Sequence, residues 1–103
     1  MNYLYVMRVL SKKTLRQFWH IHTDCEQQLL GWYKEFKMKN YQSTSEVLAS
    51  FSNCRAIGMD RYIFDIKGNN YRLIVKISFE LKTVWVRFIG THSDYDKINA
   101  LEI

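Results

Sequence analysis

Apolar and polar side chains alternate through much of the second half of the chain, and this pattern constrains the fold more than any other feature. Four runs, 55–58, 61–66, 71–79 and 84–90, are rich in β-branched and aromatic residues. Such runs are typical of strands that bury one face. The first three are separated at hairpin distances, and Gly68-Asn69 suits a turn that needs positive φ. The sequence therefore predicts an antiparallel meander over residues 55–90.

The first half of the chain shows helical spacing instead. Residues 5–10 are β-prone and end at Ser11, a residue type that caps helices, so we expect a strand that leads into a first helix. A second helix is expected to end near Lys39. Capping-box pairs predict the starts of the second and third helices: Thr23 with Glu26, and Ser43 with Glu46. Helices followed by strands predict one α+β domain over residues 1–103, with an N-terminal strand and helices packed on one face of a mainly antiparallel sheet.

The charge of the chain favours an anionic partner. Fifteen Lys and Arg stand against ten Asp and Glu, a formal net charge of +5, and residues 61–91 hold six basic side chains against two acidic ones. Nucleic acid, an acidic protein and a membrane surface all fit such a balance, and charge alone does not choose among them. With no proline and four glycines, the chain has little length for long loops. We therefore expect the functional residues mostly on helices and strands.

Several classes of protein are excluded by missing motifs. Two cysteines, Cys25 and Cys54, match neither a zinc knuckle nor a redox pair, and Cys25 is expected in the core. His20 and His22 lack the further Cys/His pair that a zinc site needs. Phosphate-loop, dinucleotide, serine-hydrolase and zinc-protease motifs are absent from the sequence. We expect no metal or other cofactor, no signal peptide, no membrane partner and a cytoplasmic location.

Alternation in the two longest runs predicts one core face and one open face. The open face is expected to carry Arg72, Ile74, Lys76, Trp85, Arg87 and Ile89, while Phe88 falls on the core face. Side chains opposite each other on neighbouring strands lie about 5 Å apart, so three cations are expected to converge beside Trp85. Like charges repel unless an anion lies among them, which predicts a phosphate-binding surface with Trp85 and Tyr62 available for base stacking. An ordinary solvated sheet face is the alternative interpretation.

One imidazole and one phenol follow the last run, in residues 90–96. Metal-free RNA cleavage needs a base for the 2′-hydroxyl, a cation for the phosphorane and an acid for the 5′-oxygen. His92 suits the base or the acid, and Arg72 and Arg87 suit bidentate phosphate contacts. The second proton-transfer role is open among Lys67, Lys76 and Tyr95. Alternatively, Thr91 or Ser93 caps a terminal helix and His92 merely packs at its start.

Two segments carry a resemblance to a known family. These are the run from Tyr62 to Ile77, with Lys67-Gly68-Asn69-Asn70-Tyr71-Arg72 at its centre, and the run from Val86 to Ile98, with Thr91-His92-Ser93-Asp94-Tyr95-Asp96. In order and spacing they resemble the HigB toxins of type II toxin–antitoxin systems, which are relatives of the RelE superfamily. Asp65 stands where an Asn is common. The resemblance extends back to Met7, so residues 1–6 are expected to be an extension, with Met7 as an alternative start.

The resemblance implies a RelE-like fold and an mRNA interferase, that is, an endoribonuclease that cleaves messages on the ribosome. It also implies neutralisation by a HigA-like helix-turn-helix antitoxin, and contact with operator DNA only through the toxin–antitoxin complex. The resemblance covers Lys67, Arg72, Lys76, Arg87, His92 and Tyr95. We expect Arg72, Lys76, Arg87, His92 and Tyr95 to be catalytic, and Lys67, with Arg61 and Trp85 outside the resembling segments, to bind the substrate. The rival hypothesis is a non-catalytic RNA-binding or ribosome-associated module that uses the same basic face.

Overall fold

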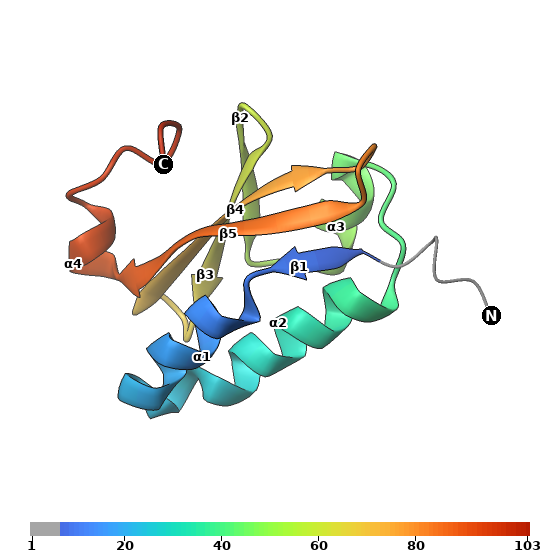
Figure 1. Cartoon of the computed structure of the whole chain (residues 1–103). Helices are drawn as coiled ribbons and strands as arrows, with labels where there is room; N and C mark the ends of the chain where they lie inside the picture. The colour runs from blue at the N-terminus through green and yellow to red at the C-terminus, as the bar shows by residue number, and fades with distance from the viewer. Residues whose placement is uncertain (1–6) are drawn as a thin grey trace.

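The computed structural model describes residues 7–103, which form a five-stranded sheet with helices against one face (Figure 1). The strands are β1 (Arg8–Leu10), β2 (Cys54–Gly58), β3 (Arg61–Ile66), β4 (Tyr71–Ser78) and β5 (Thr83–Thr91). Their order is β1-β5-β4-β3-β2, with β1 parallel to β5 and the other pairs antiparallel. The predicted α+β class and meander are confirmed. The expectations for residues 1–6 lie outside the described residues.

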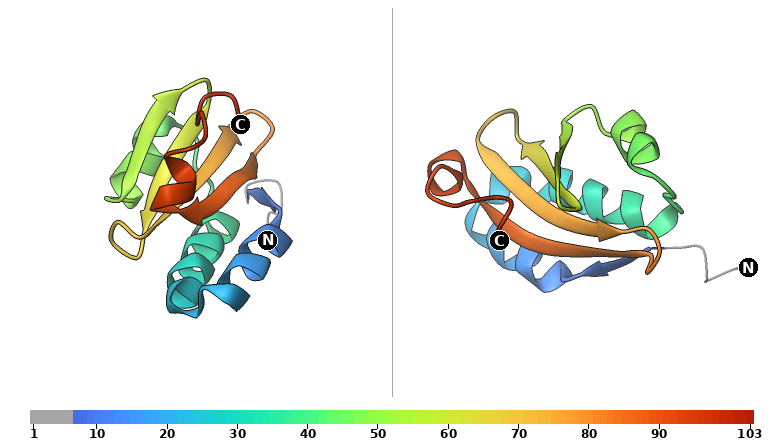
Figure 2. Two further views of the ribbon diagram at one scale, coloured as in Figure 1. Left: turned by 90° about the vertical axis from the view of Figure 1, so that its left-hand side faces the viewer. Right: turned by 90° about the horizontal axis from the view of Figure 1, so that it is seen from above.

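The helical elements precede the meander, apart from one short helix after β5. They are α1 (Lys12–Ile21), the 3-10 helix η2 (Thr23–Cys25), α2 (Glu26–Met38), α3 (Thr44–Ser50) and α4 (His92–Tyr95). Figure 1 shows α1 and α2 beneath the sheet, and Figure 2 shows α4 and the C-terminal segment on the other side. Within residues 7–103, no helix is long and apolar enough to cross a membrane.

Side-chain caps account for two of the helix starts. Ser11 and Ser43 each accept a hydrogen bond at 3.3 Å from the main-chain N–H three residues further on, as predicted. The capping box expected at Thr23 is wrong: Thr23 begins η2, and α2 starts at Glu26 with Cys25 as its N-cap residue. The thiol of Cys25 turns into the core and donates to the main-chain oxygen of His22. Burial of the Cys25 side chain, and not a side-chain cap, therefore fixes the connection between α1 and α2.

A core of aromatic and aliphatic side chains joins α1, α2 and α3 to the sheet. Phe36 of α2 is fully buried, with ring centroids 5.0 Å from Trp32, 5.3 Å from Phe51 and 6.2 Å from Phe64. The core also takes every second residue of β4, which confirms the core face predicted for that strand. Helices α1, α2 and α3 thus pack on this face of the sheet, and α4 lies on the opposite side (Figure 2).

A β-bulge in β5 changes the faces predicted for that strand. Arg87 is the extra residue, because its two neighbours pair with the adjacent β4 residues Ile74 and Val75. The alternation therefore reverses after Arg87. Ile89 packs against the main core, and Phe88 lies opposite Ile74 on the other face. The predicted sides of Phe88 and Ile89 are wrong for this reason.

Replacement of Gly31 by alanine is expected to stabilise the protein. Gly31 lies inside α2, and a Cβ atom added there would meet no atom within 4 Å. Glycine in a helix interior costs about 1 kcal/mol relative to alanine. The melting temperature of Gly31→Ala should therefore rise by about 4–8 °C, measured by circular dichroism. An unchanged or lower melting temperature would contradict this account of α2.

Candidate functional site

The sheet face opposite the main core carries three rows of neighbours across β3, β4 and β5. The basic row is Arg61, Lys76 and Trp85; the apolar row is Ile63, Ile74 and Phe88; the third row is Asp65, Arg72 and Gly90. Because residues on one row are separated from the next by two positions along β3 and β4, the outer rows are about 13 Å apart. The face is therefore two polar groups divided by an apolar strip.

The basic row forms the first polar group together with Arg87 from the bulge. The Nζ atom of Lys76 lies 5.9 Å from the centroid of the Trp85 ring, which is a cation–π contact. Arg61 Nη2 donates to the main-chain oxygen of Ile103 at 2.8 Å, and Arg87 Nε donates to the same oxygen at 3.3 Å. Guanidinium groups from β3 and β5 thus converge on one oxygen atom, an arrangement that also suits a phosphate oxygen.

Arg72 is buried in the third row, with 7% of its side chain exposed. Its Nε atom lies 3.2 Å from Asp65 Oδ1, and its other nitrogens donate to the main-chain and side-chain oxygens of Asn69. The ring centroid of Tyr95 lies 5.6 Å from the guanidinium carbon. The prediction of an exposed Arg72 that converges with Lys76 and Arg87 is wrong, because the β3–β4 turn and Tyr95 already surround this cation.

The short helix α4 presents the histidine of the site. Thr91 caps it through a capping box with Asp94, so the predicted helix is confirmed. His92 does not pack as the alternative supposed, since 46% of its side chain is exposed. Its Nδ1 atom lies 3.4 Å from Asp96 Oδ2, and its main-chain N–H donates to the oxygen of Asn70 at 2.9 Å. This leaves Nε2 of His92 for proton transfer.

Asp96 is a site residue that the sequence analysis missed. The signal was available, because residues four apart on a helix face each other and His92 and Asp96 have this spacing. A carboxylate that contacts one ring nitrogen orients an imidazole. Asp96 is therefore a candidate positioning residue for His92.

Two other predicted residues lie away from the open face. Lys67 is exposed in the β3–β4 turn, where Gln28 of α2 accepts its main-chain N–H at 2.7 Å. This contact with α2 places the Lys67 backbone beside the helical layer, at the edge of the site. Tyr62 is 3% exposed among the helices, and its hydroxyl lies 2.6 Å from Thr44 Oγ1. The prediction that Tyr62 stacks on bases is wrong, because its strand position faces the core.

The cysteines and histidines of the helical half supply no second site. Burial raises the pKa of Cys25 to about 11 and that of Cys54 to about 12, so both thiols are protonated at neutral pH and are poor nucleophiles. Among residues 7–103, no group of three or more His, Cys, Asp or Glu side chains is placed to hold a metal ion.

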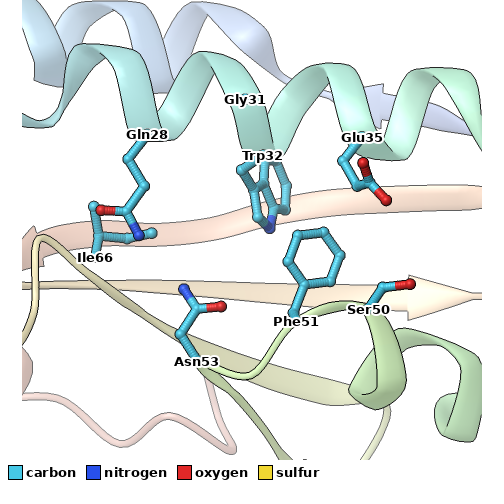
Figure 3. A pocket seen from close by; sticks show the side chains of 8 residues that line it. All are labelled: Gln28, Gly31, Trp32, Glu35, Ser50, Phe51, Asn53 and Ile66. Atoms are coloured by element: carbon cyan, nitrogen blue, oxygen red, sulfur yellow. The ribbon is translucent and has the colours of Figure 1, made fainter.

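A pocket of about 260 Å³ lies on the helical side of the sheet, between α2 and residues 50–53 (Figure 3). The indole nitrogen of Trp32 is directed into it and has no hydrogen-bond partner among the described residues. Gln28, Glu35 and Asn53 supply polar atoms at its wall, but no basic side chain lines it. The pocket therefore does not suit a phosphate, and the open face remains the candidate site.

Comparisons with known proteins agree with this architecture. The curated mRNA interferase HigB of Escherichia coli O6:H1 (strain CFT073) is 27% identical over 94 residues, which cover 89% of this chain and 91% of the relative. The mRNA interferase toxin HigB of Escherichia coli K12 and the mRNA interferase HigB of Shigella flexneri are each 29% identical over 63 residues, 61% of this chain and 60% of the relative. Residues 25–98, which include β2 to β5, match the model of the HigB toxin family, described as the RelE-like toxic component of a toxin–antitoxin system. The chain therefore belongs to the HigB toxin family.

Proposed function

We propose that this toxin is a metal-independent endoribonuclease that cleaves mRNA. The observation that carries the proposal is the convergence of Arg61 and Arg87 on one oxygen atom, on a sheet face that also carries Lys76 and Trp85. The names of the curated relatives, which are mRNA interferases, support the same activity. Within one compact surface there are cations for a phosphate and an aromatic ring for a base.

In the proposed reaction the 2′-hydroxyl oxygen attacks the adjacent phosphorus. A bond forms between the 2′-oxygen and phosphorus, and the bond from phosphorus to the 5′-oxygen breaks. One group removes the 2′-hydroxyl proton and another protonates the leaving 5′-oxygen, which gives a 2′,3′-cyclic phosphate and a 5′-hydroxyl end. No metal is required, because the arginines stabilise the charge of the phosphorane.

The residues divide into binding, proton-transfer and supporting roles. Arg61 and Arg87 hold phosphate oxygens, Lys76 adds positive charge and Trp85 stacks on a base. His92 transfers a proton with Asp96 behind it, as the base or the acid, on an RNA strand that crosses the apolar strip from the basic row. Tyr95 packs against the guanidinium of the buried Arg72, and both support the site beside His92. Lys67 contributes charge at the edge of the face.

The partners follow from the family. We propose that a HigA-like helix-turn-helix antitoxin neutralises this toxin, and that operator DNA is contacted only through the complex of the two. The proposed substrate is mRNA on the ribosome, which places the activity in the cytoplasm.

A cleavage assay tests the reaction directly. Purified protein is incubated with 5′-labelled mRNA without ribosomes in the presence of EDTA, and in parallel with ribosomes in Mg²⁺ buffer, because EDTA dissociates ribosomes. We expect cleavage that EDTA does not inhibit and that a single 2′-deoxy substitution at the scissile nucleotide abolishes, because the attacking oxygen is then missing. Cleavage that depends on a divalent metal, or that persists at the 2′-deoxy position, would contradict the proposed mechanism.

The rival function is a non-catalytic RNA-binding module. It is favoured by the burial of Arg72, whose side chain is 7% exposed and already contacts Asp65 and Asn69. Such a module would bind RNA with strong salt dependence but leave the message intact with or without ribosomes. Expression in cells would then not stop growth, whereas a toxin expressed without its antitoxin should do so.

A further inference from the structure

The candidate phosphate position is filled by the chain itself. Residues 96–103, here called the tail segment, pass back over the sheet from α4, on the side away from α1 and α2 (Figures 1 and 2). Ile103 provides the oxygen that Arg61 and Arg87 both contact. On the same face Ile63 and Ile74 are 1% and 0% exposed, although they lie outside the main core. The tail segment therefore approaches the face at the position where the proposed substrate would bind.

Local hydrogen bonds give the tail segment its direction. The side chain of Asn99 accepts the main-chain N–H of Leu101 at 3.0 Å, and its main-chain oxygen accepts the N–H of Glu102 at 3.0 Å. These bonds close a turn over residues 99–102, and asparagine favours such turns because its side chain bonds the backbone two residues ahead. The turn returns the chain to the sheet, so that Ile103 reaches the two arginines.

The arginine pair keeps a donor that the contact with Ile103 leaves unpaired. Arg61 is held independently of the tail segment, because its Nη1 donates to the main-chain oxygen of Met59 at 2.9 Å. Its Nε atom is buried and has no hydrogen-bond partner among the described residues. The contact with Ile103 therefore leaves the Nε donor of Arg61 unpaired. A phosphodiester presents two unesterified oxygens, one of which can reach a donor that the tail segment leaves unpaired.

We propose that the Arg61–Arg87 pair is a phosphodiester subsite that the tail segment occupies in the free protein, so that RNA binds by displacing Ile103. This inference rests on the proposed function, since it concerns the same face and the same substrate. Two acceptors cannot occupy one position, so the measured RNA affinity equals the intrinsic affinity multiplied by the fraction of molecules whose tail segment is released. The tail segment is therefore a built-in competitor of the substrate.

The test weakens the turn without touching either arginine. Asn99→Ala removes the side-chain acceptor of Leu101, whereas Asn99→Ser keeps an oxygen at that position and serves as the matched control. The probe is a fluorescein-labelled RNA octamer with 2′-methoxy groups, which bind but cannot attack phosphorus. Fluorescence anisotropy at low salt should give a Kd about 3- to 10-fold lower for Asn99→Ala than for the wild type, with Asn99→Ser between them. In the wild-type protein, addition of the octamer should also shift the methyl NMR signals of Ile103.

The outcomes separate this inference from the proposed function. If Arg87→Ala weakens octamer binding while Asn99→Ala binds as the wild type does, RNA uses the face without competition and the inference is overturned. Unmoved Ile103 signals at saturating octamer would overturn it as well. If neither the wild type nor Asn99→Ala binds the octamer or cleaves mRNA, the proposed function itself fails. A melting temperature of Asn99→Ala equal to that of the wild type shows that the comparison is made on folded protein.

Discussion

Arg87→Ala is expected to slow mRNA cleavage by about 100- to 1000-fold and to abolish growth arrest, while the protein stays folded. Loss of one cation that stabilises a transition state costs about 2.7–4 kcal/mol of barrier. Arg87 is exposed at the bulge, and its side chain donates to the oxygen of Ile103 at the surface, so little of the folding energy depends on it. Single-turnover cleavage of labelled mRNA measures the rate, and a thermal melt measures the stability.

Arg16→Ala is the matched control for Arg87→Ala. Arg16 is exposed on α1, on the other side of the sheet, so its replacement changes the net charge equally but leaves the basic row intact. The control should cleave at nearly the wild-type rate. Antitoxin binding by Arg87→Ala should also remain, which shows that the surface is otherwise preserved. A well-folded Arg87→Ala variant that still arrests growth would refute the assignment of Arg87.

Phe36→Ala is expected to have the largest effect on stability, a loss of about 3–5 kcal/mol in the free energy of unfolding. The Phe36 ring is fully buried, and the rings of Trp32, Tyr41 and Phe51 lie around it, so its removal leaves a cavity that rigid neighbours cannot fill. The melting temperature should fall by roughly 15–30 °C. Urea denaturation followed by tryptophan fluorescence measures the free energy.

Met38→Ala gives the comparison for Phe36→Ala on the same helix. Met38 ends α2 and is 78% exposed, so the free energy of unfolding should change by less than about 0.5 kcal/mol. If Phe36→Ala lost less than about 1 kcal/mol, the aromatic cluster would not be the stabilising centre of the helical layer.

The sequence predicted those parts of the fold that depend on local patterns. The side-chain period of two located the strands of the meander, and Ser11 and Ser43 located two helix starts, because these signals lie within a few residues of each other. The reversal at Arg87 was not predictable from alternation, since a bulge inserts one residue and nothing in the period marks it. One inserted residue was enough to misplace Phe88 and Ile89.

The candidate site was predictable in its residue types but not in its arrangement. The basic residues of β4 and β5 fell on the expected face, apart from the burial of Arg72. That burial depends on Tyr95 and Asn69, which reach Arg72 only after α4 and the β3–β4 turn have folded over the sheet. The contact of Ile103 with two arginines joins segments 16 and 42 residues apart in the sequence, and no local pattern encodes it.

The parallel pairing of β1 with β5 has a consequence for folding of this toxin during its synthesis on the ribosome. Arg8 pairs with Thr83, so the first strand waits for its partner until nearly the whole domain has been synthesised. Until then the nascent chain has an unpaired β4 edge and lacks the bulge arginine and the histidine of α4. Truncated chains that end before β5 should therefore fail to cleave mRNA and should be prone to aggregation. Only a chain that has been translated past α4 can become a toxic molecule.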